Sequence, residues 1–264
     1  MTTRSQGMRD GQHLKGRVAL VIGGSRGIGR AIAITLASAG ADIAIGYLRN
    51  DAAANETARQ VKRCGKRVLL SRMNVRSESE ISEIFVEINK TYGRLDILVH
   101  CAALTIFKPL TELTSLQISR ILDTNARAFI LTVQQASKLM SNGGVVVAMS
   151  SLGSQHYFHR YGGIGIAKAC IEASVRYFAV ELAPLGIRVN AVSAGPVETD
   201  GVKTMPSYEA RRREGVKLTP AGRVGTPEDV ARVVAFLCRK ESDWIRGQTV
   251  IADGGLSLRI GSLL

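Results

Sequence analysis

The chain has 264 residues, 45% of them hydrophobic, which is enough to bury the core of one large domain. It holds no run of about 18 apolar residues, and its polar start, MTTRSQGMRDGQHLKGR, lacks an apolar signal core. We therefore expect a cytoplasmic protein without a membrane span. Its net charge of +13 suits either anionic partners or a solvated basic surface. No nucleic-acid-binding motif accompanies the charge, which argues against nucleic acid as the main partner.

Short β-branched runs alternate with longer amphipathic stretches, such as GRAIAITLASAG (29–40) and SEISEIFVEINKTYG (79–93). This alternation predicts repeated βαβ units and a parallel sheet with helices on both faces. The fold class is therefore α/β, a single doubly wound Rossmann-type domain over residues 15–264 that follows a tail at 1–14. The predicted strands are 17–23, 42–47, 67–75, 95–100, 144–150, 187–193 and 248–253.

Residues 196–223 interrupt the alternation of predicted strands and helices. They are too polar and too broken for a core element. Parallel sheets of this kind bind ligands at the carboxyl ends of their strands. We expect this segment to form a loop or helical lid over such a site. The four cysteines are far apart in the sequence, without the close pairing that zinc and redox motifs need, so no metal site is predicted.

A glycine-rich turn, GGSRGIG, directly follows the first predicted strand and opens a helix. Glycine lets backbone amides and the helix N-terminus approach a pyrophosphate closely. The turn therefore predicts a dinucleotide site. The candidate residues are Gly23, Ser25, Arg26, Gly27, Ile28 and Gly29.

The end of the second strand bears on the choice of cofactor. NAD-specific folds place an acidic residue there for the ribose 2′-hydroxyl, but this chain reads Gly46-Tyr47-Leu48-Arg49. A planar guanidinium from Arg49, or from Arg26 in the glycine turn, binds a 2′-phosphate well. NADPH is therefore favoured over NADH, unless these arginines are plain surface charges.

Together these motifs resemble the short-chain dehydrogenase/reductase family over residues 16–258. The family's adenine-side Asp-Val looks like Asn74-Val75, and its Asn-Asn-Ala-Gly loop has become His100-Cys101-Ala102-Ala103. Its Pro-Gly region is reversed into Gly195-Pro196. The resemblance implies a homotetramer and further cofactor contacts from Asn74, Val75, Ala102, Lys168, Pro196, Val197 and Thr199.

The resemblance also implies a catalytic set. The family's serine falls on Ser151 and its active-site asparagine on Asn125, while Lys168 matches its lysine. In the family's common ketoreductases a tyrosine precedes the lysine by four residues. In this chain that position is Ile164, and Tyr161 stands seven residues before Lys168. Seven steps of about 100° nearly complete two turns, so the phenol keeps nearly the same helix face but lies roughly 4.5 Å further along the axis.

Such a displaced phenol suits a carbonyl that lies beyond the carbon receiving hydride. This is the geometry of conjugate reduction, in which hydride goes to C3 of a 2-enoyl thioester and charge develops on the C1 oxygen. The same tyrosine spacing marks bacterial enoyl-acyl-carrier-protein reductases. Stretches such as YGGIGIAKA, VNAVSAG and IRGQTVIADGGLSL look most like their third, NADPH-using class and the related enoyl-CoA reductases. The resemblance therefore implies lipid metabolism and an acyl thioester on acyl carrier protein or coenzyme A.

In this hypothesis Lys168 holds the nicotinamide ribose and lowers the pKa of the phenol, and Ser151 helps to place the thioester carbonyl. Asn125 would support Lys168 through a water chain, as the resemblance implies. Tyr157, four residues before Tyr161, is an alternative donor, although its distance from Lys168 favours a pocket wall. Two other functions stay open: a ketoreductase with a different substrate pose, and a non-catalytic NADP-binding protein in which Ile164 marks lost chemistry.

Overall fold

The computed structural model describes residues 12–203 and 208–259. Most of the predicted tail, and the apolar end at 260–264, lie outside the described residues. Leu14, the last residue of the predicted tail, is buried, and its backbone N–H donates to the Ala39 carbonyl at 2.8 Å. The packed domain therefore includes Leu14.

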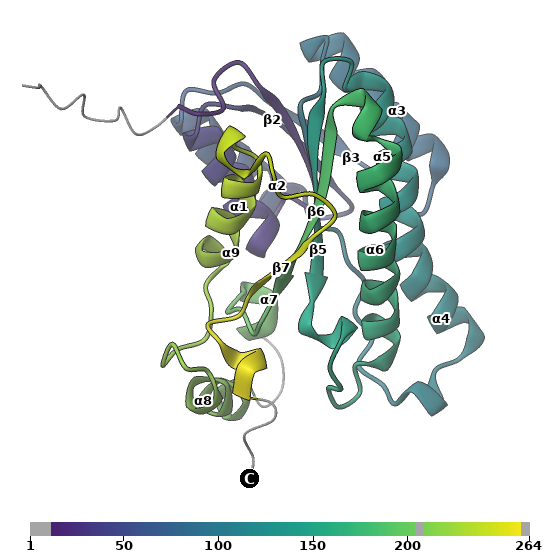
Figure 1. The fold of residues 1–264 in the computed structure, drawn as a ribbon, viewed down its shortest axis with the longest axis vertical. Helices are drawn as coiled ribbons and strands as arrows, with labels where there is room; N and C mark the ends of the chain where they lie inside the picture. The colour runs from purple at the N-terminus through teal and green to yellow at the C-terminus, as the bar shows by residue number, and fades with distance from the viewer. Residues whose placement is uncertain (1–11, 204–207, 260–264) are drawn as a thin grey trace, which may run out of the picture.

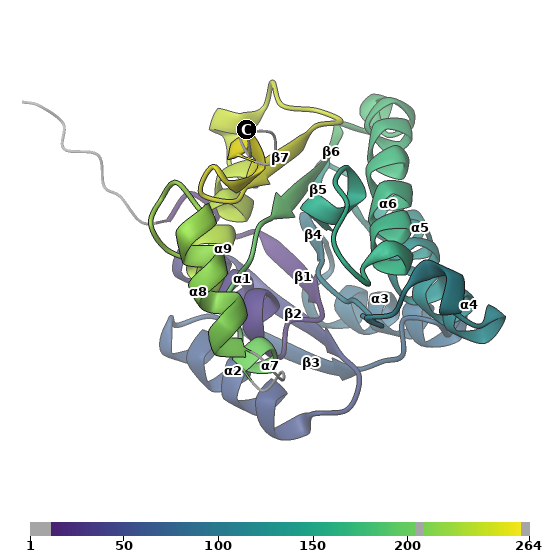
Figure 2. The same ribbon diagram turned by 90° about the horizontal axis from the view of Figure 1, so that it is seen from below.

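Seven parallel strands form one sheet, and all seven match the predicted segments. Their bounds are β1 (Val18–Ile22), β2 (Asp42–Tyr47), β3 (Val68–Arg72), β4 (Ile97–His100), β5 (Gly144–Ser151), β6 (Ile187–Ala194) and β7 (Thr249–Ala252). The order across the sheet is β3-β2-β1-β4-β5-β6-β7 (Figures 1 and 2). The order reverses between β1 and β4, and open α/β sheets bind ligands in the crevice beyond this point.

Helices cover both faces of the sheet, as the alternating pattern predicts (Figure 1). One core packs beneath α1 (Gly27–Ser38), α2 (Asp51–Arg63) and α9 (Pro227–Leu237). The other packs beneath α3 (Glu78–Tyr92), α5 (Ala128–Leu139) and α6 (Gly162–Glu181). The remaining helices are α4 (Ser115–Leu122), α7 (Asp200–Lys203) and α8 (Tyr208–Leu218). In the part of the chain that the structure describes, no helix is both long and apolar enough to cross a membrane.

Local sequence signals fix several helix ends. Thr226 and Asp229 form a capping box at the start of α9, with Pro227 in its first turn, where the missing N–H of proline costs nothing. Helix α3 begins after Ser77, whose side chain accepts from the Glu80 backbone, and ends at Gly93 with φ 70°, a conformation that favours glycine.

The predicted lid at 196–223 contains α7 and α8. Figure 1 shows both helices below the sheet, at the end toward which the strand arrows point. They therefore lie at the carboxyl end of the sheet, on the same side as the crevice beyond β1 and β4, where the strand order reverses. The segment between them, 204–207, lies outside the described residues.

Candidate functional site

In the glycine turn between β1 and α1, backbone atoms of different residues lie too close together for a side chain to fit between them. A Cβ on Gly29 would lie 2.1 Å from the Gly23 carbonyl oxygen, and one on Gly23 would lie 2.8 Å from the Ala102 nitrogen. Gly23 and Gly27 also have φ of 82° and 54°, which side chains rarely adopt. The Arg26 side chain does not cap α1, so the first-turn amides of this helix stay available to an anion.

Two side chains that sequence reasoning missed brace this turn. Arg30 donates to the Ser25 carbonyl from Nη2 at 3.0 Å, and the Thr57 hydroxyl donates to the same oxygen at 2.9 Å. Thr57 is fully buried in α2. The sequence holds no signal for this contact, because the acceptor is a backbone oxygen in a different element.

The glycine turn, which follows β1, is contacted by the loops that follow β4 and β6. Thr199 lies beside Gly27, since a Cβ there would meet Thr199 Cγ2 at 3.4 Å. Ala102 packs on Gly23 from the loop after β4. Val197 forms an isolated parallel bridge with Gly225. The structure thus brings three predicted cofactor segments together, as a dinucleotide requires.

The other predicted cofactor residues lie around the same turn. Ile28 packs against the core under α1, whereas Pro196 is exposed beyond β6. After β3, the Asn74 side-chain oxygen accepts from the Arg76 backbone at 3.1 Å, and Val75 is 9% exposed.

Arg26 and Arg49 are both solvent-exposed. The Gly23 N–H donates to the Gly46 carbonyl at 2.8 Å, which places the end of β2 beside the glycine turn. Arg49 follows that strand end by two residues. Both arginines therefore stand at the part of the site where the adenosine ribose of a dinucleotide would lie.

Tyr161 and Ser151 meet at the other half of the site. Ser151 is the last residue of β5, and Tyr161 is the N-cap of α6. The phenol oxygen donates to Ser151 Oγ at 3.1 Å. Ile164, at the position where the common ketoreductases carry tyrosine, is fully buried. The structure therefore pairs the predicted serine with the displaced tyrosine.

The ring of Tyr161 is held from several sides. A Cβ on Gly153 would lie 2.4 Å from ring atoms of Tyr161, so only glycine fits beneath it. Phe107 and Phe158 flank the ring, with centroid separations of 5.9 and 6.3 Å. Tyr157 is 86% exposed. Phe107 and Phe158 therefore pack against the phenol ring, whereas Tyr157 as a pocket wall stays a prediction.

Lys168 lies on α6, seven residues after Tyr161, and its side chain is buried. Its ammonium donates to the Met149 carbonyl at 2.8 Å, just before the strand end that carries Ser151. Burial lowers the pKa of Lys168 to about 8, and the nearby Cys101 thiol acts in the opposite direction. For Tyr161, burial raises the phenol pKa, while the Ser151 hydrogen bond lowers it less. The phenol is therefore protonated at neutral pH and can donate a hydrogen bond.

Asn125 lies in a π-helical turn (Asp123–Arg127) between α4 and α5, a feature common at functional sites. Its amide nitrogen donates to the carbonyls of Leu104 and Ile121, at 3.0 and 2.8 Å. Its side-chain oxygen is buried and has no partner among the described residues. That oxygen fits the predicted role of receiving a water, although the water chain to Lys168 stays a prediction.

His100, at the end of β4, is also buried without a hydrogen-bond partner for either ring nitrogen in the described chain. Its ring meets the edge of Phe129 at 5.6 Å between centroids. Burial, together with the positive charge of Lys168, lowers the pKa of His100 to about 3. The imidazole is therefore neutral at neutral pH.

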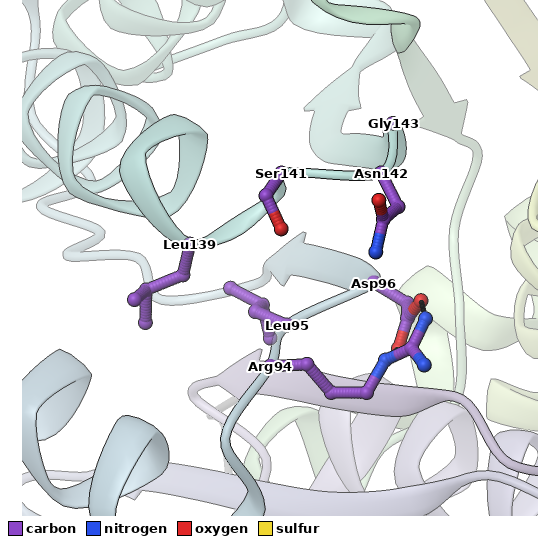
Figure 3. Close-up of a pocket in the computed structure, with 7 residues that line it drawn as sticks. All are labelled: Arg94, Leu95, Asp96, Leu139, Ser141, Asn142 and Gly143. Carbon is purple, nitrogen blue, oxygen red and sulfur yellow. Dashed lines mark hydrogen bonds and ion pairs between the residues drawn. The ribbon is translucent and has the colours of Figure 1, made fainter.

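A small hollow at the opposite end of the sheet is not a candidate site (Figure 3). Asp96 in its wall accepts from Arg94 Nη2 at 2.6 Å and from the Val18 backbone at 2.9 Å. The bond from Val18 joins the start of β1 to the residue that precedes β4. The hollow is therefore lined by groups that hold the sheet together.

Residues 22–257 match the family model described as enoyl-(acyl carrier protein) reductase. A 1-cyclohexenylcarbonyl-CoA reductase from Streptomyces collinus is 39% identical, covering 92% of this chain and 87% of its own. A hydroxynaphthalene reductase-like protein Arp2 from Metarhizium guizhouense is 34% identical, covering 92% and 95%.

Among solved structures, a putative short-chain alcohol dehydrogenase from Sinorhizobium meliloti 1021 superposes with a TM-score of 0.88 at 31% identity, covering 93% of this chain and 98% of that one. A short-chain dehydrogenase/reductase from Serratia marcescens has a TM-score of 0.88 at 30% identity, covering 93% and 100%. The chain belongs to the short-chain dehydrogenase/reductase family. It is an oxidoreductase of the kind that uses a nicotinamide dinucleotide.

Proposed function

We propose that this protein is an NADPH-dependent reductase of 2-enoyl thioesters. The observation that carries the proposal is the pairing of Ser151 with Tyr161 at 3.1 Å, while Ile164 is buried and offers no proton. The phenol thus stands at the cap of α6, one turn further out than in the family's common ketoreductases. That displacement suits an oxygen three bonds from the carbon that receives hydride, rather than one bond away as in a ketone.

A bound NADPH supplies the hydride for C3 of the enoyl group. As the C2–C3 double bond is reduced, negative charge moves onto the thioester oxygen, and the neutral phenol of Tyr161 is the donor that stabilises it. The single proton of the phenol goes to Ser151 Oγ in the structure. With substrate bound it turns to the thioester oxygen, while the Ser151 hydroxyl donates to the phenol oxygen and so orients it. The buried ammonium of Lys168 lies on the same helix and favours the negative charge electrostatically. A proton added at C2 completes the saturated product.

The choice of NADPH is supported by two exposed arginines and by the lack of an acidic residue in the stretch from Gly46 to Arg49 at the end of β2. Arg49 follows β2 and Arg26 lies in the glycine turn. A 2′-phosphate between them would gain charge-assisted hydrogen bonds. The 2′-hydroxyl of NADH would find no carboxylate at Gly46 or Leu48.

The test is NADPH oxidation with crotonyl and longer 2-enoyl thioesters, on coenzyme A and on acyl carrier protein. With deuterium carried on the transferable position of NADPH, we expect the label at C3 of a saturated acyl chain. No turnover at any chain length, with cofactor binding intact, would remove the proposal and favour a non-catalytic NADP-binding protein.

A ketoreductase is the second candidate, because Ser151 and Tyr161 form the hydroxyl pair that would also bind a ketone oxygen. The similarity to a hydroxynaphthalene reductase-like protein points the same way. Equal concentrations of 2-enoyl and 3-oxoacyl thioesters separate the two functions. In the ketoreductase, deuterium would appear on a carbinol carbon.

We also propose a homotetramer. Apolar side chains on the outer face of α6 are exposed in the single chain, including Tyr177 at 70% and Val180 at 75%. Burial against another subunit would remove this surface from water. Sedimentation of a monomer at micromolar concentration would refute the assembly.

A further inference from the structure

Glu172 is a buried carboxylate that the reaction described above does not use. It is 5% exposed and lies on α6, four residues after Lys168. Residues four apart on a helix share a face, so Glu172 faces the same side of the sheet as the active-site lysine. Burying a carboxylate is unfavourable unless its oxygens accept hydrogen bonds. Its partners therefore indicate what the side chain does.

All of these partners belong to the segment that surrounds Ser151. Oε1 of Glu172 accepts from the hydroxyl of Ser150 at 2.6 Å and lies 2.6 Å from the hydroxyl of Ser154. Oε2 accepts from the Gln155 side-chain amide at 3.2 Å. The Ser154 hydroxyl is also 2.8 Å from the Ser151 carbonyl, so its single proton serves one acceptor at a time. The carboxylate thus binds the chain on both sides of Ser151.

We infer that Glu172 is a positioning residue that fixes Ser151 and Tyr161 relative to Lys168. The segment it holds contains Gly153, on which the ring of Tyr161 rests, as well as Ser151, to which the phenol donates. Glu172 therefore ties the loop that supports the phenol to the helix that carries the ammonium. This role rests on the family chemistry and holds for an enoyl or a ketone substrate alike.

Two substitutions at this site separate the acceptor function from simple packing. Glu172→Leu keeps a similar volume but removes both acceptors, whereas Glu172→Gln retains one oxygen that can accept from both serines. Misplacing reacting groups by about 1 Å can cost about a hundredfold in rate. We expect Glu172→Leu to lower kcat about 10- to 100-fold with the KM for NADPH within about twofold, and Glu172→Gln to stay within about threefold of the unaltered protein.

The matched control is Glu181→Leu, at an exposed position on the same helix, which should leave kcat unchanged. An unchanged kcat in Glu172→Leu would overturn the inference. So would an equal loss in Glu172→Gln, because charge rather than hydrogen bonding would then matter. If Glu172→Leu does not fold, Ser154→Ala removes one hydroxyl and should lower kcat about threefold or more at an unchanged melting temperature. A Ser154→Ala rate equal to that of the unaltered protein would also overturn it.

A second readout does not depend on the substrate. With tyrosine labelled by ¹³C at Cζ, the Tyr161 resonance is the one that Tyr161→Phe removes. We expect this resonance to move in Glu172→Leu and Ser154→Ala but not in Glu181→Leu. A Tyr161 resonance that stays in place in both variants would refute the positioning role even if no tested thioester is reduced, whereas lack of turnover in the unaltered protein refutes only the proposed function.

Discussion

The phenol oxygen of Tyr161 lies 3.1 Å from Ser151 Oγ, although Tyr161 stands outside α6 and Ser151 ends β5. The contact is made by a helix cap and a strand end, rather than from a position inside the helix. Helix α6 begins at Gly162, and Ile164 in its first turn is buried. The phenol therefore stands at the cap of α6, the position from which the proposed function has it reach the thioester oxygen.

Removing this phenol tests the catalytic assignment. Tyr161→Phe keeps the ring over Gly153 but loses the donor for the developing negative charge. We expect kcat to fall about a hundredfold or more while the KM for NADPH stays the same. Steady-state kinetics give the answer, with Tyr92→Phe as the control, since the Tyr92 hydroxyl donates to the Ile43 carbonyl at the opposite end of the sheet. If Tyr157→Phe shows this loss and Tyr161→Phe does not, Tyr157 is the donor.

Gly153 should be as sensitive as the phenol it supports. A Cβ at this position would lie 2.4 Å from ring atoms of Tyr161, so Gly153→Ala must push the ring away from Ser151. We expect a tenfold or larger loss of kcat and a destabilisation of about 1 to 3 kcal/mol from overpacking. Kinetics and denaturant unfolding measure the two effects. A variant with the original kcat would show that the ring position is not critical.

The proposed preference for NADPH rests on the exposed arginines Arg26 and Arg49. Arg49→Ala should weaken NADPH about tenfold, because a charge-assisted contact to the 2′-phosphate is lost, and should leave NADH nearly unaffected. Fluorescence titration with both cofactors measures the ratio, and Arg63→Ala at the far end of α2 serves as the control. An unaltered preference would make Arg49 a surface charge and leave the preference to Arg26.

His100 should make the protein sensitive to acid. Its pKa is about 3 in the folded protein against 6.5 for an ordinary imidazole, so the unfolded chain binds the proton first as the pH falls below 6.5. The stability contributed by this neutral group is complete above pH 6.5 and is lost toward pH 3, with a loss of about 2 kcal/mol already at pH 5.

The measurement is urea unfolding at pH 7.5 and pH 5. His100→Leu should lose less stability than the unaltered protein over this interval, because it has no imidazole to protonate. The exposed His159→Gln is the comparison variant and should behave like the unaltered protein. Equal pH dependence in His100→Leu would show that the buried imidazole does not control acid stability.

The sequence by itself determined the fold and the types of residue available for cofactor binding and catalysis. Alternating β-branched and amphipathic segments predicted all seven strands, because a strand buried on both faces must be apolar throughout. The turn GGSRGIG predicted a dinucleotide site after the first strand, since glycine lets backbone amides approach a pyrophosphate. The seven-residue spacing from Tyr161 to Lys168 indicated a phenol displaced outward from the position used by the common ketoreductases.

Tertiary structure decided which side chains meet. The sequence held no sign that Phe107 and Phe158 flank the phenol, because side-chain direction in an irregular loop follows from packing. The hydrogen bonds from Ser150 and Ser154 to Glu172 were not predictable, because hydroxyls can pair with many acceptors. Local periodicity fixes which face of a helix is buried, whereas the partner of a buried polar atom is chosen by segments that are distant in the sequence.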